Sequence, residues 1–376
     1  MRDDHNGTGY PWPPASATGI GSMPGTDPAE AMRVIAGELP DFPHLPELPA
    51  RGPGADLTGR TAALLIDIPA EVTPRGWRIA ERPGRDLVRA RSMLSSDLDV
   101  LEEVLQGFRG TVKIQLCGPW TLAATLELPK TLNVALADPG AVADLTVSLA
   151  EGAAAHVAEV AKRVPGTRVV VQFDEPALPA VAAGAVPNAS GLSRLAPVEA
   201  DTLQERLGQV LASIPGYTVV HCCAPTVPFG IIRLAGAEAA AFDLSQLRRG
   251  EEDGVAEAAE AGLGLLIGAV PALPGGAQGS GGADLPSGDE DSRTRRTAAP
   301  TRPGEVDGAR QTGERVIRLW RRLGLPLAAL AEQAVITAAC GLAGASPDQA
   351  RAVLARCRVA AGILPELIEE TGGEPR

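Results

Sequence analysis

The feature that most constrains the fold is a regular alternation of short apolar runs with longer segments of helical character. The apolar runs lack polar alternation, which is typical of strands buried on both faces, as parallel strands are. Seven runs are clear and an eighth is expected within 62–68; the clear ones are 18–22, 111–116, 168–173, 217–221, 239–242, 263–269 and 334–337. The helical segments are 27–37, 95–107, 140–163, 197–213, 227–235, 251–261, 313–323 and 347–364.

About eight strand–helix units predict an α/β fold of the (β/α)8 type, a closed TIM barrel, rather than an open sheet. A chain of 376 residues with 45% hydrophobic content suits one large barrel. We expect a flexible N-terminal tail at 1–16 and a single barrel over 17–376. Residues 274–308 are rich in Gly, Ser, Pro and charge, and they predict a disordered low-complexity insertion.

Composition argues against several partner classes. The net charge of −12 and the aromatic content of 3% disfavour binding to nucleic acid or to an anionic membrane. The first 16 residues lack the pattern of a signal peptide, and no apolar stretch is long enough to span a membrane. Five cysteines, an odd number, suit a reducing compartment. We therefore expect a cytoplasmic protein.

Polar and sulfur-bearing residues follow the predicted strands. Ser22, Asp174, His221, Asp243 and Cys340 each stand at or just after the end of an apolar run. The carboxyl ends of the strands of a parallel barrel meet at one face, where active sites form. These side chains are therefore expected to converge on one cavity.

His221, Cys223 and Cys340 form the group with the clearest chemistry. His221 and Cys223 are two residues apart, so on a strand they point to the same side. Thiolates with an imidazole select zinc, and three protein ligands with one open position are typical of catalytic zinc. Buried cysteines and a core histidine are the alternative, and spacing alone leaves both interpretations open.

Five motifs in order extend this picture over nearly the whole chain, from 18 to 364. They are IGSMP at 20–24, GPWT at 118–121, QFDEPAL at 172–178, HCC at 221–223 and CGL at 340–342. With them the chain resembles the C-terminal catalytic barrel of the cobalamin-independent methionine synthase family. The family's motifs read IGSFP, GPVT, QIDEPAL, HMC and CGL.

The resemblance implies a zinc site. His221, Cys223 and Cys340 match the family's zinc ligands, and Asp243 stands where the family has a glutamate as fourth ligand. The shorter aspartate is a departure: Asp243 either ligates the metal directly, binds through water, or does not bind.

The resemblance also assigns substrate contacts. Asp174 matches the residue that holds the amino group of the substrate, and Ser22 matches a contact to the backbone end of the amino acid. Glu47 is a candidate for a second carboxylate on the amino group. Trp120 and Thr121 are expected at the methyl-donor cleft, although Trp120 would also serve as a plug of the barrel mouth. Without the resemblance, Asp174 reads as a turn residue and Ser22 as a helix cap.

The implied activity is that of a zinc-dependent S-methyltransferase similar to 5-methyltetrahydropteroyltriglutamate–homocysteine methyltransferase. It would methylate the thiol of homocysteine to give methionine. Full-size members of the family carry a second, N-terminal barrel that helps to bind folate polyglutamate, and this chain has no room for one. The expected donor is therefore either 5-methyltetrahydrofolate or a methylcorrinoid on a partner protein.

Two other functions stay open at this point. A metal-free enzyme related to uroporphyrinogen decarboxylase would share the barrel, but it gives no reason for the histidine and the cysteines. Its anionic substrate also favours arginines near the first strand, and none occurs there before Arg33. A non-catalytic barrel that binds zinc or a thiol is the other alternative.

Overall fold

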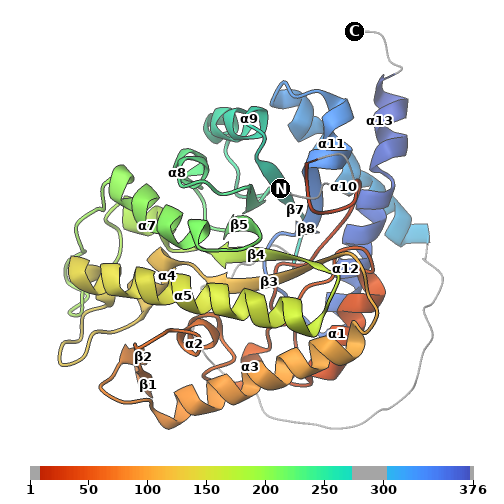
Figure 1. Cartoon of the computed structure of the whole chain (residues 1–376). Coiled ribbons are helices and arrows are strands. Elements are labelled where there is room, and N and C mark those ends of the chain that lie inside the picture. Colours follow the sequence, from red (N-terminus) through yellow and green to blue (C-terminus); the bar gives the residue numbers. More distant parts are fainter. Residues whose placement is uncertain (1–8, 273–302, 373–376) are drawn as a thin grey trace.

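The computed structural model describes residues 9–272 and 303–372, and its centre is a curled, six-stranded parallel sheet (Figure 1). The strands pair in chain order: β3 (Thr111–Cys117), β4 (Arg168–Asp174), β5 (Tyr217–Cys222), β6 (Ala239–Asp243), β7 (Gly264–Val270) and β8 (Ala334–Ala338). All but two of their residues are buried, as expected for strands covered on both faces. The fold is therefore α/β, and six of the predicted strands are confirmed.

Helices connect the strands and lie around the outside of the sheet (Figure 1). Each of the eight predicted helices is present: α1 (Pro28–Glu38), α3 (Arg85–Val104), α5 (Pro139–Arg163), α7 (Ala200–Ala212), α8 (Phe229–Leu234), α9 (Glu252–Glu260), α10 (Pro303–Arg322) and α12 (Pro347–Gly362). Asp27, Asp138 and Ser346 cap α1, α5 and α12, and a proline follows each of them in the first turn.

Smaller elements fill the connections. They are the helices α2 (Leu57–Ala62), α4 (Pro119–Thr125), α6 (Leu178–Ala182), α11 (Leu327–Gln333) and α13 (Leu364–Gly372), with a hairpin of β1 (Ala70–Thr73) and β2 (Gly76–Ile79). No helix in the two described stretches is both long enough and apolar enough to cross a membrane.

Two extended segments lie between the edge strands β8 and β3. The first segment, 16–23, pairs with β8 through a parallel bridge between Ala17 and Ile336. The second, 43–47, pairs with β3 through a bridge between His44 and Lys113. Ser22 and Glu47 join the two segments to each other, and the Met23 amide donates to the Glu47 carbonyl at 2.8 Å. The predicted run 18–22 therefore lies in an extended segment held by single bridges.

The strand predicted within 62–68 is wrong. Asp56 caps a helix there by accepting from the Gly59 amide, so α2 continues to Ala62 and a turn follows. Residues 43–47 take the position beside β3 instead. Pro43 and Pro46 cannot donate ladder hydrogen bonds, which is why this segment did not read as a strand.

The N-terminal segment is ordered further than predicted. Trp12 is fully buried: it stacks on Phe42 at 6.0 Å, and its indole donates to the Glu332 carbonyl. A Cβ on Gly264 would lie 2.6 Å from the Trp12 ring, so glycine makes the room for it. Trp12 and Phe42 pack with the inner face of the sheet, at Val170, Val219, Ala239, Ala241, Leu266 and Val335.

Residues 9–16 are therefore not part of a flexible tail, because Trp12 anchors them. The prediction for residues 1–8 lies outside the described residues. The predicted disordered insertion also lies outside the described residues over most of its length, 274–302. Its last six residues, 303–308, differ from the prediction because they form the start of α10.

Replacing Trp12 by alanine should lower the free energy of unfolding by about 3–5 kcal/mol, because a fully buried aromatic ring leaves a cavity. Denaturant unfolding of the two proteins measures the difference. Val88, which is 59% exposed on α3, serves as the control, and Val88→Ala should change stability by less than about 0.5 kcal/mol. Equal effects from the two substitutions would contradict this role for Trp12.

Candidate functional site

The register of three neighbouring strands brings the candidate residues to one level. Asp174 on β4 pairs with His221 on β5, and His221 pairs with Ala241 on β6. Paired residues on parallel strands point to the same face, and alternate residues on one strand share a face. Asp174, His221, Cys223 and Asp243 therefore share the inner face, beyond the apolar cluster that holds Val219 and Ala241.

Two cysteines that are 117 positions apart in sequence meet at this level. The Cys223 and Cys340 sulfurs lie 3.4 Å apart, and both thiols are free. The hydrogen bond between the two thiols lowers the pKa of Cys340 to about 6, and burial opposes this change. The same hydrogen bond raises the pKa of Cys223. The pair therefore favours one thiolate, at Cys340.

His221 is oriented by a carboxylate. Its Nδ1 lies 2.6 Å from Oδ1 of Asp174, and Gln172 donates to the same oxygen at 2.7 Å. An Nδ1–H that donates to Asp174 leaves Nε2 with a free lone pair. Nε2 of His221 is buried and has no hydrogen-bond partner among the described residues. A histidine held in this way is typical of metal ligands, whose other nitrogen is usually fixed by a carboxylate.

Asp243 occupies the expected strand end but has other contacts. It is buried at the end of β6, and its Oδ1 accepts from the amide and the hydroxyl of Ser245 at 2.8 and 2.7 Å. Within the described part of the chain, no three His, Cys, Asp or Glu side chains are already arranged as a metal site. The structure thus joins Cys223 to Cys340 and His221 to Asp174, and it places Asp243 on the neighbouring strand.

Glu47 and Ser22 lie next to this group. Glu47 is buried, and its nearest cation is Arg60 at 3.8 Å. Burial raises the pKa of Glu47 to about 7; Arg60 opposes this rise and the charge of Asp174 adds to it. The Ser22 carbonyl accepts from the Leu342 amide at 2.8 Å, which holds Ser22 beside the loop that carries Cys340.

Four buried polar atoms in this region lack hydrogen-bond partners among the described residues: Nε2 of His221, Oε1 of Gln172, Oε1 of Glu47 and Nε of Arg60, which is 3.8 Å from that glutamate oxygen. Buried polar atoms are nearly always paired in folded proteins, so each exception requires an explanation.

Trp120 and Thr121 belong to a packed structure rather than to an open surface. Trp120 is 1% exposed, and its indole donates to the Leu203 carbonyl at 3.0 Å. Both Trp120 and Thr121 are anchored by the fully buried Glu175, which accepts from their amides and from the Thr121 hydroxyl. Both predicted roles of Trp120, in the methyl-donor cleft or as a plug of the barrel mouth, stay predictions.

Glu175 was missed because Asp-Glu-Pro after a strand reads as an ordinary turn. Burial raises the pKa of Glu175 to about 7, and the hydrogen bonds from Thr121 and Trp120 oppose that rise. A Cβ at Gly118 would lie 2.4 Å from Glu175, so the GPWT and DEP motifs fit together across the sheet. The sequence contains a signal for this contact, because Gly118 and Glu175 follow the ends of two adjacent strands.

Lys113 was also missed. It is fully buried on β3, donates to the Ile20 carbonyl at 2.8 Å, and lies close enough to Asp174 and Glu47 for their charges to affect it. Burial lowers the pKa of Lys113 to about 8, and those two carboxylates oppose the change. A lysine inside an apolar run is the sequence signal, because a buried charge requires partners.

Comparisons with known proteins identify what the chain is similar to. A family model described as "Cobalamin-independent synthase, Catalytic domain" matches residues 15–271. No curated protein matches the sequence. A B12-independent methionine synthase from Shewanella sp. W3-18-1, solved in complex with selenomethionine, superposes with a TM-score of 0.56 at 12% identity, covering 95% of this chain and 100% of that one.

A second solved structure, a methyltransferase from Methanosarcina mazei, superposes with a TM-score of 0.52 at 15% identity. The match covers 96% of this chain and 94% of that one. At these identities the likeness to the two solved structures concerns the fold.

Replacing Glu175 by glutamine should lower the free energy of unfolding by about 1–3 kcal/mol, because the new NH₂ group would face amide donors in a buried site. Denaturant unfolding measures this change. Glu205→Gln is the control, since the Glu205 side chain is 66% exposed and should tolerate the same substitution. If the Glu175→Gln variant is as stable as the unmodified protein, Glu175 does not anchor α4.

Proposed function

Because the chain belongs to the family described as cobalamin-independent synthase, catalytic domain, we propose that it methylates the thiol of homocysteine to give methionine. One observation carries the proposal. The Cys223 and Cys340 sulfurs lie 3.4 Å apart, and Nε2 of His221, two residues before Cys223, is buried without a hydrogen-bond partner among the described residues. In the reaction a bond forms between the substrate sulfur and the methyl carbon, and the bond between methyl and donor breaks.

The proposal includes a closed eight-stranded barrel. Segments 16–23 and 43–47 would be its first two strands, since they link β8 to β3 through parallel bridges and to each other at Ser22 and Glu47. Closure would put the carboxyl ends of all strands around one cavity, where barrel active sites lie.

We propose that His221, Cys223 and Cys340 hold a zinc ion. The donor set fits, because two thiols and one imidazole are ligands that zinc prefers, and Nε2 of His221 is oriented for a further bond. A bound zinc ion supplies the Lewis acidity that makes a thiol deprotonated at neutral pH. Asp243 is the candidate for a fourth ligand; its Oδ1 accepts from the amide and the hydroxyl of Ser245, and a carboxylate can bind a metal through one oxygen while the other accepts hydrogen bonds.

The chain's own groups prepare the site. Asp174 accepts the Nδ1 proton of His221 and so fixes the tautomer that offers Nε2. The contact between the two cysteines holds Cys340 as the thiolate.

The substrate ammonium group would lie between Glu47 and Asp174, which are close enough for their charges to interact. Two carboxylates favour a cation, and Oε1 of Glu47 accepts no hydrogen bond among the described residues, with Arg60 3.8 Å away. Ser22, at the edge of the same group, would contact the carboxylate end of the amino acid. The methyl donor in this proposal is 5-methyltetrahydrofolate, as the resemblance implies; the comparisons give no support to a corrinoid-carrying partner.

Replacing Cys340 or Cys223 by alanine should abolish both zinc retention and methionine formation, because each substitution removes a thiolate ligand. Elemental analysis of the purified protein counts the zinc, and product analysis with homocysteine and 5-methyltetrahydrofolate measures turnover. Cys222→Ala is the matched control: Cys222 is adjacent in sequence but alternates to the other face of β5 and should keep both properties.

Two results would contradict the proposal. Full activity in protein that contains no zinc would exclude the metal role. Zinc retention without methylation of any small thiol would favour a non-catalytic zinc-binding barrel.

Replacing Glu47 by glutamine should raise KM for homocysteine about tenfold and change kcat by less than about twofold, because the lost charge acts on a non-reacting group of the substrate. Steady-state kinetics with homocysteine as the varied substrate separates the two constants. Glu71→Gln, in a surface ion pair with Arg78, is the control. An unchanged KM in Glu47→Gln would remove Glu47 from the substrate site.

A further inference from the structure

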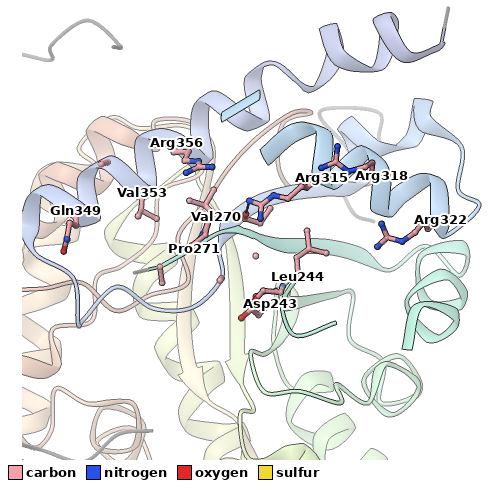
Figure 2. Close-up of a pocket in the computed structure, with 16 residues that line it drawn as sticks. Asp243, Leu244, Val270, Pro271, Arg315, Arg318, Arg322, Gln349, Val353 and Arg356 are labelled. Carbon is pink, nitrogen blue, oxygen red and sulfur yellow. Dashed lines mark hydrogen bonds between the residues drawn. The ribbon is translucent and has the colours of Figure 1, made fainter. Parts of the chain in front are cut away.

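A second region of the molecule has the geometry of a ligand site. A pocket of about 680 Å³ lies where the ends of β7 and β8 meet α10 and α12 (Figure 2). Val270, Pro271 and Ala339 supply its apolar wall. Asp243 lies on the barrel side, and four arginines extend from the two helices on the other side (Figure 2).

Arg315, Arg318 and Arg356 form at most one weak ion pair with the acidic side chains of the described residues. Arg315 donates to the Ala269 carbonyl at 2.6 Å, and Arg356 donates to the Gly308 carbonyl at 2.7 Å. Neither has a carboxylate within ion-pair distance in the described ranges. Arg318 is 3.8 Å from Glu314 on its own helix, a distance at the limit of an ion pair.

The fourth arginine differs. Arg322 forms an ion pair with Glu252 at 2.9 Å and is largely neutralised by it. It therefore ties α10 to α9 at the edge of the pocket and contributes little free charge.

The positive groups repel one another. Arg315 and Arg318 are three residues apart and lie on the same side of α10, and Arg356 faces them from α12. Burial, followed by the charges of Arg356 and Arg318, lowers the pKa of Arg315. An arginine keeps its proton under such conditions, so the repulsion persists in the protein. In a chain with a net charge of −12, this local concentration of positive charge is not explained by composition.

Asp243 lies across the pocket from α10, and its Oδ1 accepts from Ser245 (Figure 2). The pocket therefore has one acidic end at the sheet and one cationic wall at the helices. An elongated ligand would place its anionic groups at the wall.

We propose that this pocket binds a small molecule with two or more anionic groups, either phosphates or carboxylates, through Arg315, Arg318 and Arg356. Guanidinium groups match both anions with paired hydrogen bonds, and such an anion would relieve the repulsion among the three arginines. The loops after the last two strands of a barrel frequently form phosphate sites, and this pocket lies at the ends of β7 and β8. The pocket shares Asp243 with the proposed zinc site, but the inference and its test concern anion binding by the arginines alone, so either proposal can fail without the other.

Isothermal titration calorimetry of the full chain tests the proposal with two probes, pyrophosphate and citrate, at constant ionic strength. We expect one bound equivalent of at least one probe. The double variant Arg315→Gln/Arg318→Gln should bind at least about tenfold more weakly, since charge-assisted hydrogen bonds are lost. Arg321→Gln is the matched control: Arg321 lies on the same helix, is exposed, and donates to the Thr371 carbonyl away from the pocket.

Each outcome decides the matter. Binding of pyrophosphate alone, of citrate alone, or of both supports the site and identifies the anion class. If neither pyrophosphate nor citrate binds, the proposal is wrong. An equal loss of affinity in Arg321→Gln, or unchanged affinity in the double variant, also overturns it, because binding would then follow the overall charge of the protein.

Discussion

The in-register pairing of β4, β5 and β6 is the constraint from which the candidate site follows. Because Asp174 stands opposite His221, and His221 opposite Ala241, every residue at the carboxyl ends of these strands has a fixed height and a fixed face. A shift of one residue would send His221 into the outer apolar layer and break its contact with Asp174. The catalytic chemistry that we propose therefore depends on backbone hydrogen bonds in the sheet before it depends on any ligand.

Two buried glutamates illustrate how similar side chains acquire different roles in this framework. Glu175 accepts three hydrogen bonds from the start of α4 and so fixes the loop after β3. Glu47 keeps one oxygen that accepts no hydrogen bond among the described residues; Arg60 lies 3.8 Å from it, and the charges of Asp174 and Lys113 also act on Glu47. Burial raises both pKa values to about 7, but only the second glutamate has an atom available for a ligand. Satisfied hydrogen bonding separates a structural carboxylate from a candidate binding carboxylate.

The sequence predicted the elements that have strong local signals. Apolar runs located β3 to β8, and the alternation of His221 and Cys223 along a strand predicted their common face. The sequence also predicted that Cys223 and Cys340 would lie close together, because both follow strands of one parallel sheet. The predictions of the strand near 62–68 and of the flexible N-terminal tail failed because tertiary contacts decide both. Segment 43–47 carries prolines and has no strand pattern, and Trp12 is anchored by residues far along the chain.

The arginine pocket was not predictable for a related reason. Arg315 and Arg356 come from two helices whose sequences show only the usual exposed charges, and their proximity arises from the packing of α10 against α12. Charges that belong to one surface in space are separated along the chain by a strand and a helix.

Trp12 also has a kinetic consequence. Its indole donates to the Glu332 carbonyl, 320 positions away, and the Ala15 amide donates to the Ala331 carbonyl. Contacts with such large sequence separation require the closure of very long loops, so they slow folding. During synthesis on the ribosome, Trp12 can be buried only after residues near 332 have been made. Until then its aromatic ring stays exposed to chaperones and to other nascent chains.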